Sequence, residues 1–348
     1  MITPNPLLGL ILHAIGALSA AFCYTPQKGT RQWSWQTYWL AQAVVCWFAL
    51  PIVGAWLTVP ELGRVLAEAP RSAMWTSFAL GALYGVGGTA FGVAIRYIGF
   101  SLTYAIAIGI SCMLGTVLPA VWRGELAAIW EKTGSGFVLA GIVIGAAGIL
   151  ASGLAGRFKE LDRGGNGGGF NLAKGLPLCL LAGVLSAVYG FALAAGQPIA
   201  DVAAAHGAGH FQGNVIYIFS NTGAFLTTAV YSLWLHHKHR TLGEYTAAQN
   251  PRLALNFALA VLTGCLWYGQ FFFYGLAHVR MGDYQFSSWA LHMIMLVLFS
   301  SLAGFIWREW TGCKPRTWVM LTLALLILVG AVLSLAYGNF LGDAAAGH

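Results

Sequence analysis

The sequence predicts an all-α fold, namely a polytopic membrane protein of ten transmembrane helices in two inverted five-helix repeats. The first reason is composition, because 58% of the 348 residues are hydrophobic and only 8% are charged, whereas about a quarter are charged in soluble domains. The second reason is that the apolar residues form blocks long enough to cross about 30 Å of hydrocarbon as helices. The third is that short strings from the first half of the chain recur in the second.

The ten expected spans follow one another with short connections. Strands of a membrane barrel have about ten residues that alternate between apolar and polar, whereas these blocks are longer and apolar on every side. The first block has no Lys or Arg before it and no clear small-residue cleavage site after it, unlike a secretory signal peptide, so we expect it to remain as a helix. We place the spans near residues 7–24, 38–58, 73–94, 98–121, 135–154, 175–198, 213–235, 254–277, 285–307 and 317–338.

An internal repeat relates the two halves of the chain. The string Gly16–Ala20 (GALSA) returns 167 residues later as Gly183–Ala187 (GVLSA). A second set recurs at a constant offset of 183, with Gly81, Leu83, Gly92 and Gly99 matching Gly264, Leu266, Gly275 and Gly282. We therefore expect residues 1–160 to form the first five-helix repeat and residues 175–348 to form the second. The Gly-rich segment 161–174 would be a flexible linker between them.

Five is an odd number, so the second repeat would lie upside down relative to the first. Inverted repeats are common in alternating-access carriers, which hold their substrate near the middle of the membrane between the repeats. Span 73–94 also carries glycines on one helix face, at Gly81, Gly85, Gly88 and Gly92. Small residues of this kind let a neighbouring helix approach closely.

The basic residues predict the orientation in the membrane. Thirteen of the 18 Lys and Arg residues lie in the connections that follow the odd-numbered spans, and five lie on the other side. Cytoplasmic loops carry the excess of basic residues, so both termini are expected in the periplasm. The net charge of +7 thus reports topology, and the expected partner is the lipid bilayer and not nucleic acid.

The cysteines indicate neither a disulfide framework nor a metal site. Five of the six lie inside apolar blocks, and no C-x-x-C pattern occurs. A structural zinc site or a paired-cysteine scaffold would need such a spacing. We therefore expect no metal and no cofactor.

A polar and aromatic stripe runs along the expected span 254–277. Trp267, Gln270, Phe271 and Tyr274 fall at i, i+3, i+4 and i+7, and His278 follows at i+11. These spacings place all five on one helix face. Because an unpaired polar group in hydrocarbon is costly, such a face usually points into the bundle.

Two further stripes share this character. In the expected span 285–307, Gln285, Trp289 and His292 fall at i, i+4 and i+7, with Ser288 beside them, and in the first span His13 shares a face with Tyr24. The rings of the three stripes could stack on a pyranose, and their amide, hydroxyl and imidazole groups could bind its hydroxyls. The alternative is that the aromatic residues form interfacial belts and the histidines only pack.

The ionisable residues bear on what drives transport. No Asp or Glu falls in the middle of any expected span, so histidine is the candidate for a proton site. Imidazole, with an ordinary pKa near 6.5, exchanges a proton over the physiological pH range. The candidates for proton coupling are His13 and His292, with Asp283 near the turn between spans eight and nine.

Five short strings of the sequence are specific enough to be compared with known families. They are His13–Ala21 (HAIGALSAA), Trp33–Thr37 (WSWQT), Trp267–Tyr274 (WYGQFFFY), Ser288–Met293 (SWALHM) and Arg308–Trp310 (REW). These strings resemble the bacterial L-rhamnose:proton symporter family, and the resemblance extends from about residue 7 to residue 338. It implies the drug/metabolite transporter superfamily, ten helices in two inverted halves, the bacterial inner membrane, and uptake of a 6-deoxyhexose together with a proton.

Other interpretations stay open at this point. An exporter of drugs or metabolites could use the same ten-helix fold, and a channel is a further alternative. A membrane-embedded transferase would need clustered acids to hold a metal-bound diphosphate, whereas the loops offer isolated acids such as Glu125 and Asp201. We therefore expect a transporter and not an enzyme.

Overall fold

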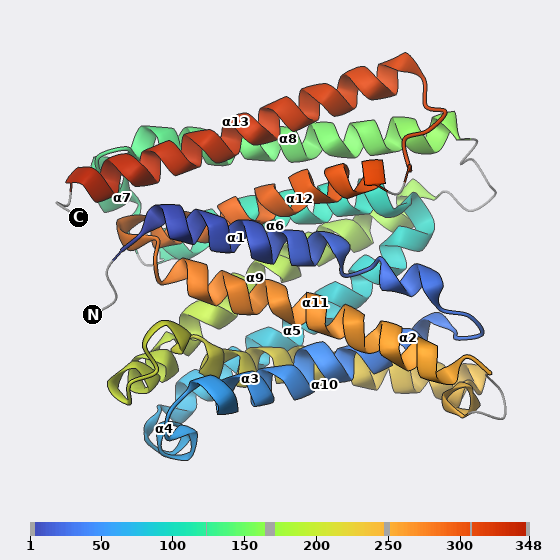
Figure 1. Cartoon of the computed structure of the whole chain (residues 1–348), viewed down its shortest axis with the longest axis horizontal. Coiled ribbons are helices and arrows are strands. Elements are labelled where there is room, and N and C mark those ends of the chain that lie inside the picture. The colour runs from blue at the N-terminus through green and yellow to red at the C-terminus, as the bar shows by residue number, and fades with distance from the viewer. Residues whose placement is uncertain (1–3, 123, 164–170, 247–250, 307, 346–348) are drawn as a thin grey trace. The chain divides into compact units, whose positions relative to one another are not determined.

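The structure is a computed structural model (Figure 1). It describes residues 4–122, 124–163, 171–246, 251–306 and 308–345. Within these ranges every regular element is helical. The longer elements are α1 (Pro6–Phe22), α2 (Trp35–Ala43), the π-helix η2 (Val44–Ala49), α3 (Leu50–Thr58), α5 (Arg71–Ile98), α6 (Phe100–Trp122), α8 (Ser135–Asp162), α9 (Leu172–Ala205), α10 (Asn214–His239), α11 (Leu253–His278), α12 (Ser288–Ile306) and α13 (Pro315–Ala345).

Short helices lie in the connections. The apolar pattern of the sequence did not predict α4 and α7, because each has seven residues or fewer and lies outside the apolar blocks. The short elements are α4 (Leu62–Glu68), α7 (Leu126–Glu131) and the 3-10 helices η1 (Pro26–Gly29), η3 (Gly209–Phe211), η4 (Leu242–Tyr245) and η5 (Gly282–Ser287).

Each expected span coincides with a helix or, for span 38–58, with the continuous run from α2 to α3. Nine of these segments in the described part of the chain are long and apolar enough to cross a membrane. The helix outside this group is α10, which has 26 residues and therefore the length to cross. Its polar side chains, among them Asn214, Asn221 and Thr228, and the histidines at its end make it less apolar than the others.

The chain divides into two compact units. Unit 1 comprises Met1–Ala21, Gly87–Gly190 and Leu276–His348, and unit 2 comprises Phe22–Val86 and Phe191–Gly275. Each unit therefore draws on both expected repeats, and the boundaries fall within or at the end of α1, α5, α9 and α11. Part of the predicted linker, residues 164–170, lies outside the described residues, and the repeat organisation stays a prediction.

In unit 1, α13 lies along α8, and α6 and α12 also pack on α8 (Figure 1). Glycines on α8 make this approach possible. A methyl group at Gly141 or Gly148 would collide with Leu335 or Leu328 of α13, and one at Gly145 would collide with Ile294 of α12. This is how small residues promote helix packing where lipid supplies no hydrophobic drive.

In unit 2, α10 packs on α2, η2 and α3, and glycines bring α5 against it. A methyl group at Gly81 would overlap the backbone of Ser220, and one at Gly223 would overlap the backbone of Phe78. Between the same two helices, the Thr227 hydroxyl of α10 donates to the carbonyl of Ala82 of α5 at 3.0 Å. Two of the four glycines predicted to form a packing face, Gly81 and Gly85, thus contact α10.

Candidate functional site

An aromatic cluster lies in unit 2 around Trp267 of α11. The ring of Trp267 meets that of Tyr24 edge-on at a centroid distance of 6.0 Å and that of Trp47 at 5.6 Å. Tyr24 in turn stacks on Trp39 at 6.2 Å with an interplanar angle of 8°. Two residues predicted from separate stripes, Tyr24 and Trp267, are therefore brought together by the fold.

Trp267 combines a flat ring with a hydrogen-bond donor for which the described residues offer no acceptor. Its indole Nε1 is buried and has no hydrogen-bond partner among the described residues. Burying a donor without an acceptor costs about 1–3 kcal/mol, and native proteins contain few such groups. An oxygen of a bound solute would remove this cost.

The other predicted sugar-binding residues of α11 are also buried. Gln270, Phe271 and Tyr274 are each less than a tenth exposed, and the Phe271 ring lies 6.0 Å from that of Trp267. The backbone carbonyl of Phe271 accepts a hydrogen bond from the Tyr217 hydroxyl of α10 at 2.7 Å. Packing against α10 thus holds the stripe on α11 in position.

Two residues of the cluster were not predicted from the sequence, Trp39 and Trp47. Both are buried, and they come from α2 and the π-helix η2. A signal was present, since Trp35, Trp39, Gln42 and Cys46 fall at i, i+4, i+7 and i+11, the helical spacing seen in α11. Trp47 is off this stripe by one residue, and π-turns, which are frequent at functional sites, are difficult to foresee from sequence.

A pair of histidines lies in unit 1. The rings of His13 on α1 and His292 on α12 are 5.8 Å apart between centroids and inclined by 60°, and both residues are almost fully buried. The fold therefore brings together two proton-coupling candidates that are 279 positions apart in sequence.

The remaining predicted residues lie in or near η5 and α12. Trp289 donates from Nε1 to the carbonyl of Ser111 on α6 at 3.0 Å. A methyl group at Gly115 of α6 would collide with the Trp289 indole, so the absence of a side chain there lets this ring pack between α12 and α6. Ser288 is fully buried, whereas Gln285 is exposed. The side chain of Asp283 lies outside what the structure describes.

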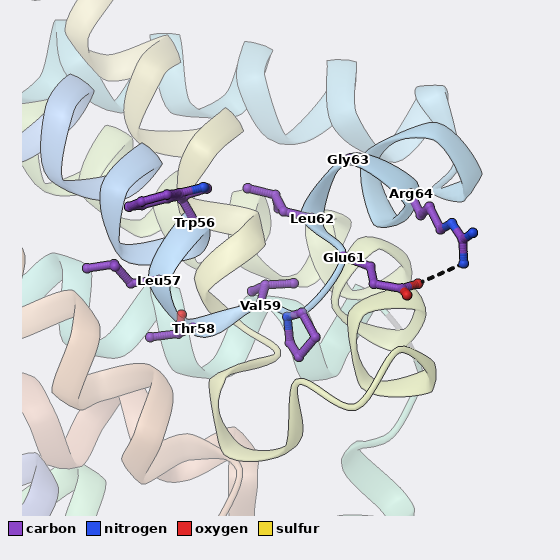
Figure 2. A pocket seen from close by; sticks show the side chains of 9 residues that line it. Trp56, Leu57, Thr58, Val59, Glu61, Leu62, Gly63 and Arg64 are labelled. Carbon is purple, nitrogen blue, oxygen red and sulfur yellow. Dashed lines mark hydrogen bonds and ion pairs between the residues drawn. The ribbon is translucent and has the colours of Figure 1, made fainter.

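An open hollow of about 710 Å³ lies where α3 ends and α4 begins (Figure 2). It is formed by the consecutive residues 56–64. Figure 2 shows Glu61 facing Arg64, and their ion pair measures 3.1 Å. The exposed Trp56 and Leu57 end the expected span 38–58, where aromatic residues commonly mark the membrane interface. We therefore interpret this hollow as a feature of the membrane surface.

Potential metal ligands do not gather in the described part of the chain. Within those ranges no group of three or more His, Cys, Asp or Glu side chains is placed to hold a metal ion. The free cysteines Cys23, Cys46, Cys112 and Cys179 are buried. The chemistry that the two clusters offer is stacking, hydrogen bonding and proton exchange.

Comparison with known proteins identifies relatives over nearly the whole chain. Residues 3–339 match the family described as L-rhamnose-proton symport protein (RhaT). An L-rhamnose-proton symporter of Pectobacterium carotovorum is 33% identical, over 95% of this chain and 98% of its own. One of Cronobacter sakazakii is also 33% identical, over 93% and 95%.

A solved crystal structure is similar in fold alone. It covers 94% of each chain with a TM-score of 0.52 and 17% sequence identity. The family match and the relatives agree with the resemblance of the five sequence strings. This chain belongs to the L-rhamnose-proton symporter family.

Proposed function

We propose that the chain is a secondary active transporter that takes up L-rhamnose, or a related 6-deoxyhexose, in symport with protons by alternating access. The names of its relatives support this substrate pair and do not favour the exporter alternative. In this proposal all ten long segments, α10 included, cross the bacterial inner membrane as two inverted repeats of the drug/metabolite transporter kind. Both termini lie in the periplasm.

The observation that carries the sugar part of the proposal is the unused indole donor of Trp267 within a ring of aromatic side chains. Aromatic faces stack on the apolar face of a pyranose, and buried donors bind its hydroxyl oxygens. Tyr24, Gln270, Phe271 and Tyr274 would complete the contacts of unit 2. Ser288, Trp289 and Gln285 of unit 1 are the further sugar-binding candidates.

The proton part of the proposal rests on His13 and His292. Two imidazolium groups this close would repel each other, and burial already disfavours a single charge. The pair would therefore carry at most one positive charge, that is, one proton beyond those of two neutral rings, at a time. A single proton moving down about 100 mV supplies about 2.3 kcal/mol, which corresponds to roughly fifty-fold accumulation of a neutral sugar.

Helix α11 offers a physical link between the two events. Its residues Trp267 and Gln270 belong to the sugar cluster, and the same continuous helix ends at His278 in unit 1, the unit that contains the histidine pair. A shift of α11 on sugar binding would thus alter the surroundings of the proton site. Asp283 follows shortly after, in η5, and is the third coupling candidate.

The test is uptake of radiolabelled L-rhamnose into proteoliposomes with an imposed pH gradient. We expect accumulation that a protonophore abolishes and that an excess of unlabelled L-rhamnose competes away. A panel of unlabelled hexoses and 6-deoxyhexoses as competitors would define the substrate. Uptake that is indifferent to the pH gradient, or absent for every sugar in the panel, would refute the proposal.

A further inference from the structure

The segment from Trp35 to Thr58 contains an irregularity that places side chains in the aromatic cluster. It starts as α2, widens into the π-helix η2 and resumes as α3. Pro51 near the start of α3 has no N–H to donate to the residue four positions before it. One residue earlier, the N–H of Leu50 donates to the carbonyl of Val45, five residues before it, which is the hydrogen bond of a π-turn. The wider turn rotates Trp47 towards the face that carries Trp39, and their rings lie 6.3 Å apart.

Three hydrogen-bond donors on this segment are buried close together along the chain. The Nε1 atoms of Trp39 and Trp47 and the Nε2 atom of Gln42 are buried, and none of the three has a hydrogen-bond partner within the described ranges. Gln42 and Trp47 are each 1% exposed and Trp39 is 4% exposed. Buried polar groups in native proteins are normally paired, so a ligand that accepts hydrogen bonds from these three donors, which lie on adjacent turns, would remove the cost of burying them.

The amide of Gln42 is also oriented. Its Oε1 atom accepts a hydrogen bond from the thiol of Cys46, one turn later, at a sulfur-to-oxygen distance of 3.4 Å. Because the oxygen is held in this way, the NH₂ end is the part of the amide that remains to bind something else. Cys46 is fully buried, so its thiol is shielded from solvent and donates to Gln42 instead of to water.

We propose that Gln42 is a sugar-binding residue, positioned by Cys46, which together with the indole N–H groups of Trp39 and Trp47 donates to the hydroxyl oxygens of the transported 6-deoxyhexose. This inference rests on the proposed function and adds residues that determine specificity. A site built to hydrogen-bond a hydroxyl strongly rejects an analogue that lacks it, because the buried donors are left unpaired. Sugars that lack one ring hydroxyl should therefore bind much more weakly than L-rhamnose.

The test is equilibrium binding of radiolabelled L-rhamnose to the purified full-length protein. We expect Gln42→Ala to raise Kd at least ten-fold. Cys46→Ala should raise it about three- to ten-fold because the amide loses its orientation, and Cys46→Ser should remain near the parent because a hydroxyl can still donate to Oε1. The double variant Gln42→Ala/Cys46→Ala should bind no more weakly than Gln42→Ala alone, which a merely structural role for Cys46 would not produce.

Gln36→Ala is the matched control. Gln36 lies on the same helix and is also buried, but its amide donates to the Thr241 hydroxyl at 3.0 Å. Its loss should lower the melting temperature and leave Kd unchanged.

Parent-like affinity in Gln42→Ala, with weakened binding in Trp267→Ala, would overturn this inference and leave the proposed function standing. If Gln42→Ala does not fold, equal affinities of Cys46→Ala and Cys46→Ser would overturn it instead. Failure of the parent protein to bind L-rhamnose would overturn both.

Discussion

The aromatic cluster of unit 2 and the histidine pair of unit 1 are both buried, yet they present opposite chemistry. Indole and amide groups keep one charge state across the physiological pH range, whereas imidazole changes its charge within it. The aromatic cluster is thus suited to a neutral solute and the histidine pair to a proton. Under the proposed function, solute recognition and energy coupling reside on different residues, so each can be disabled without the other.

The largest loss of stability that we predict comes from a change in the packing of α5 against α10 in unit 2. Gly223→Ala places a methyl group against the backbone of α5 at Phe78 and Gly81, and backbone cannot yield as a flexible side chain can. We expect a loss of about 3 kcal/mol or more in the free energy of unfolding, measured by thermal melting in detergent. Gly330→Ala in unit 1 is the control, because nothing lies within 4 Å of the place that its methyl group would take. Equal melting temperatures for the two variants would contradict the packing argument.

Removal of titration from unit 1 should abolish coupling. His13→Gln and His292→Gln keep a hydrogen-bonding side chain but cannot carry a proton, so at least one of them should reduce accumulation from about fifty-fold to near unity. Exchange of labelled for unlabelled L-rhamnose at equal pH should persist, since the aromatic cluster is untouched. If both variants accumulate sugar as the parent does, histidine coupling is wrong and Asp283 becomes the next candidate.

Removal of a ring or an amide from unit 2 should have the complementary effect. Trp267→Ala and Gln270→Ala should each weaken L-rhamnose binding by about 1–3 kcal/mol, that is, about five-fold to 160-fold, while sugar that does bind remains coupled to protons. Trp318→Ala is the control, because Trp318 is 39% exposed on α13. Unchanged affinity in both α11 variants, measured by equilibrium binding, would show that the stripe only packs.

The smallest effect concerns a third histidine, which lies outside both clusters. His206 places Nδ1 3.2 Å from Glu61 and Nε2 2.8 Å from Glu68, while Arg64 pairs with Glu61. Two ionised carboxylates can both accept from the ring only when both ring nitrogens carry a proton, so these contacts favour the imidazolium form. The hydrogen bond to Glu68, followed by that to Glu61, raises the pKa of His206.

This raised pKa predicts a pH dependence that the aromatic cluster would not produce. The stabilisation is fully present below about pH 6.5, the ordinary pKa of histidine, and it is lost as pH rises through the higher pKa of the folded protein. The melting temperature of the parent should therefore fall relative to that of His206→Gln as pH rises from about 6.5 through the raised pKa of the folded protein. The exposed His237 provides the control His237→Gln, and parallel curves for all three proteins would show that the Glu61–His206–Glu68 contacts add no stability.

Much of the fold follows from local sequence. All ten expected spans correspond to helical segments, because a block of apolar residues in lipid must satisfy its own backbone hydrogen bonds and a helix does so within the block. The α11 stripe was equally accessible, since i, i+3, i+4 and i+7 spacing places side chains on one face whatever the surroundings. The short helices α4 and α7 and the π-turn at Val44–Ala49 left no comparable periodic signal.

The sequence by itself therefore determined the helices, their apolar character and the family, and it identified Trp267 and His13 as residues of interest. Only the tertiary structure decided which stripes meet. It set Trp267 against Tyr24 and Trp47 in unit 2 and paired His13 with His292 in unit 1. The physical reason is that the helical period shows which residues share a face of one helix. Which other helix packs against that face depends on contacts between segments far apart in the chain, such as the close approach of two helices at glycine residues.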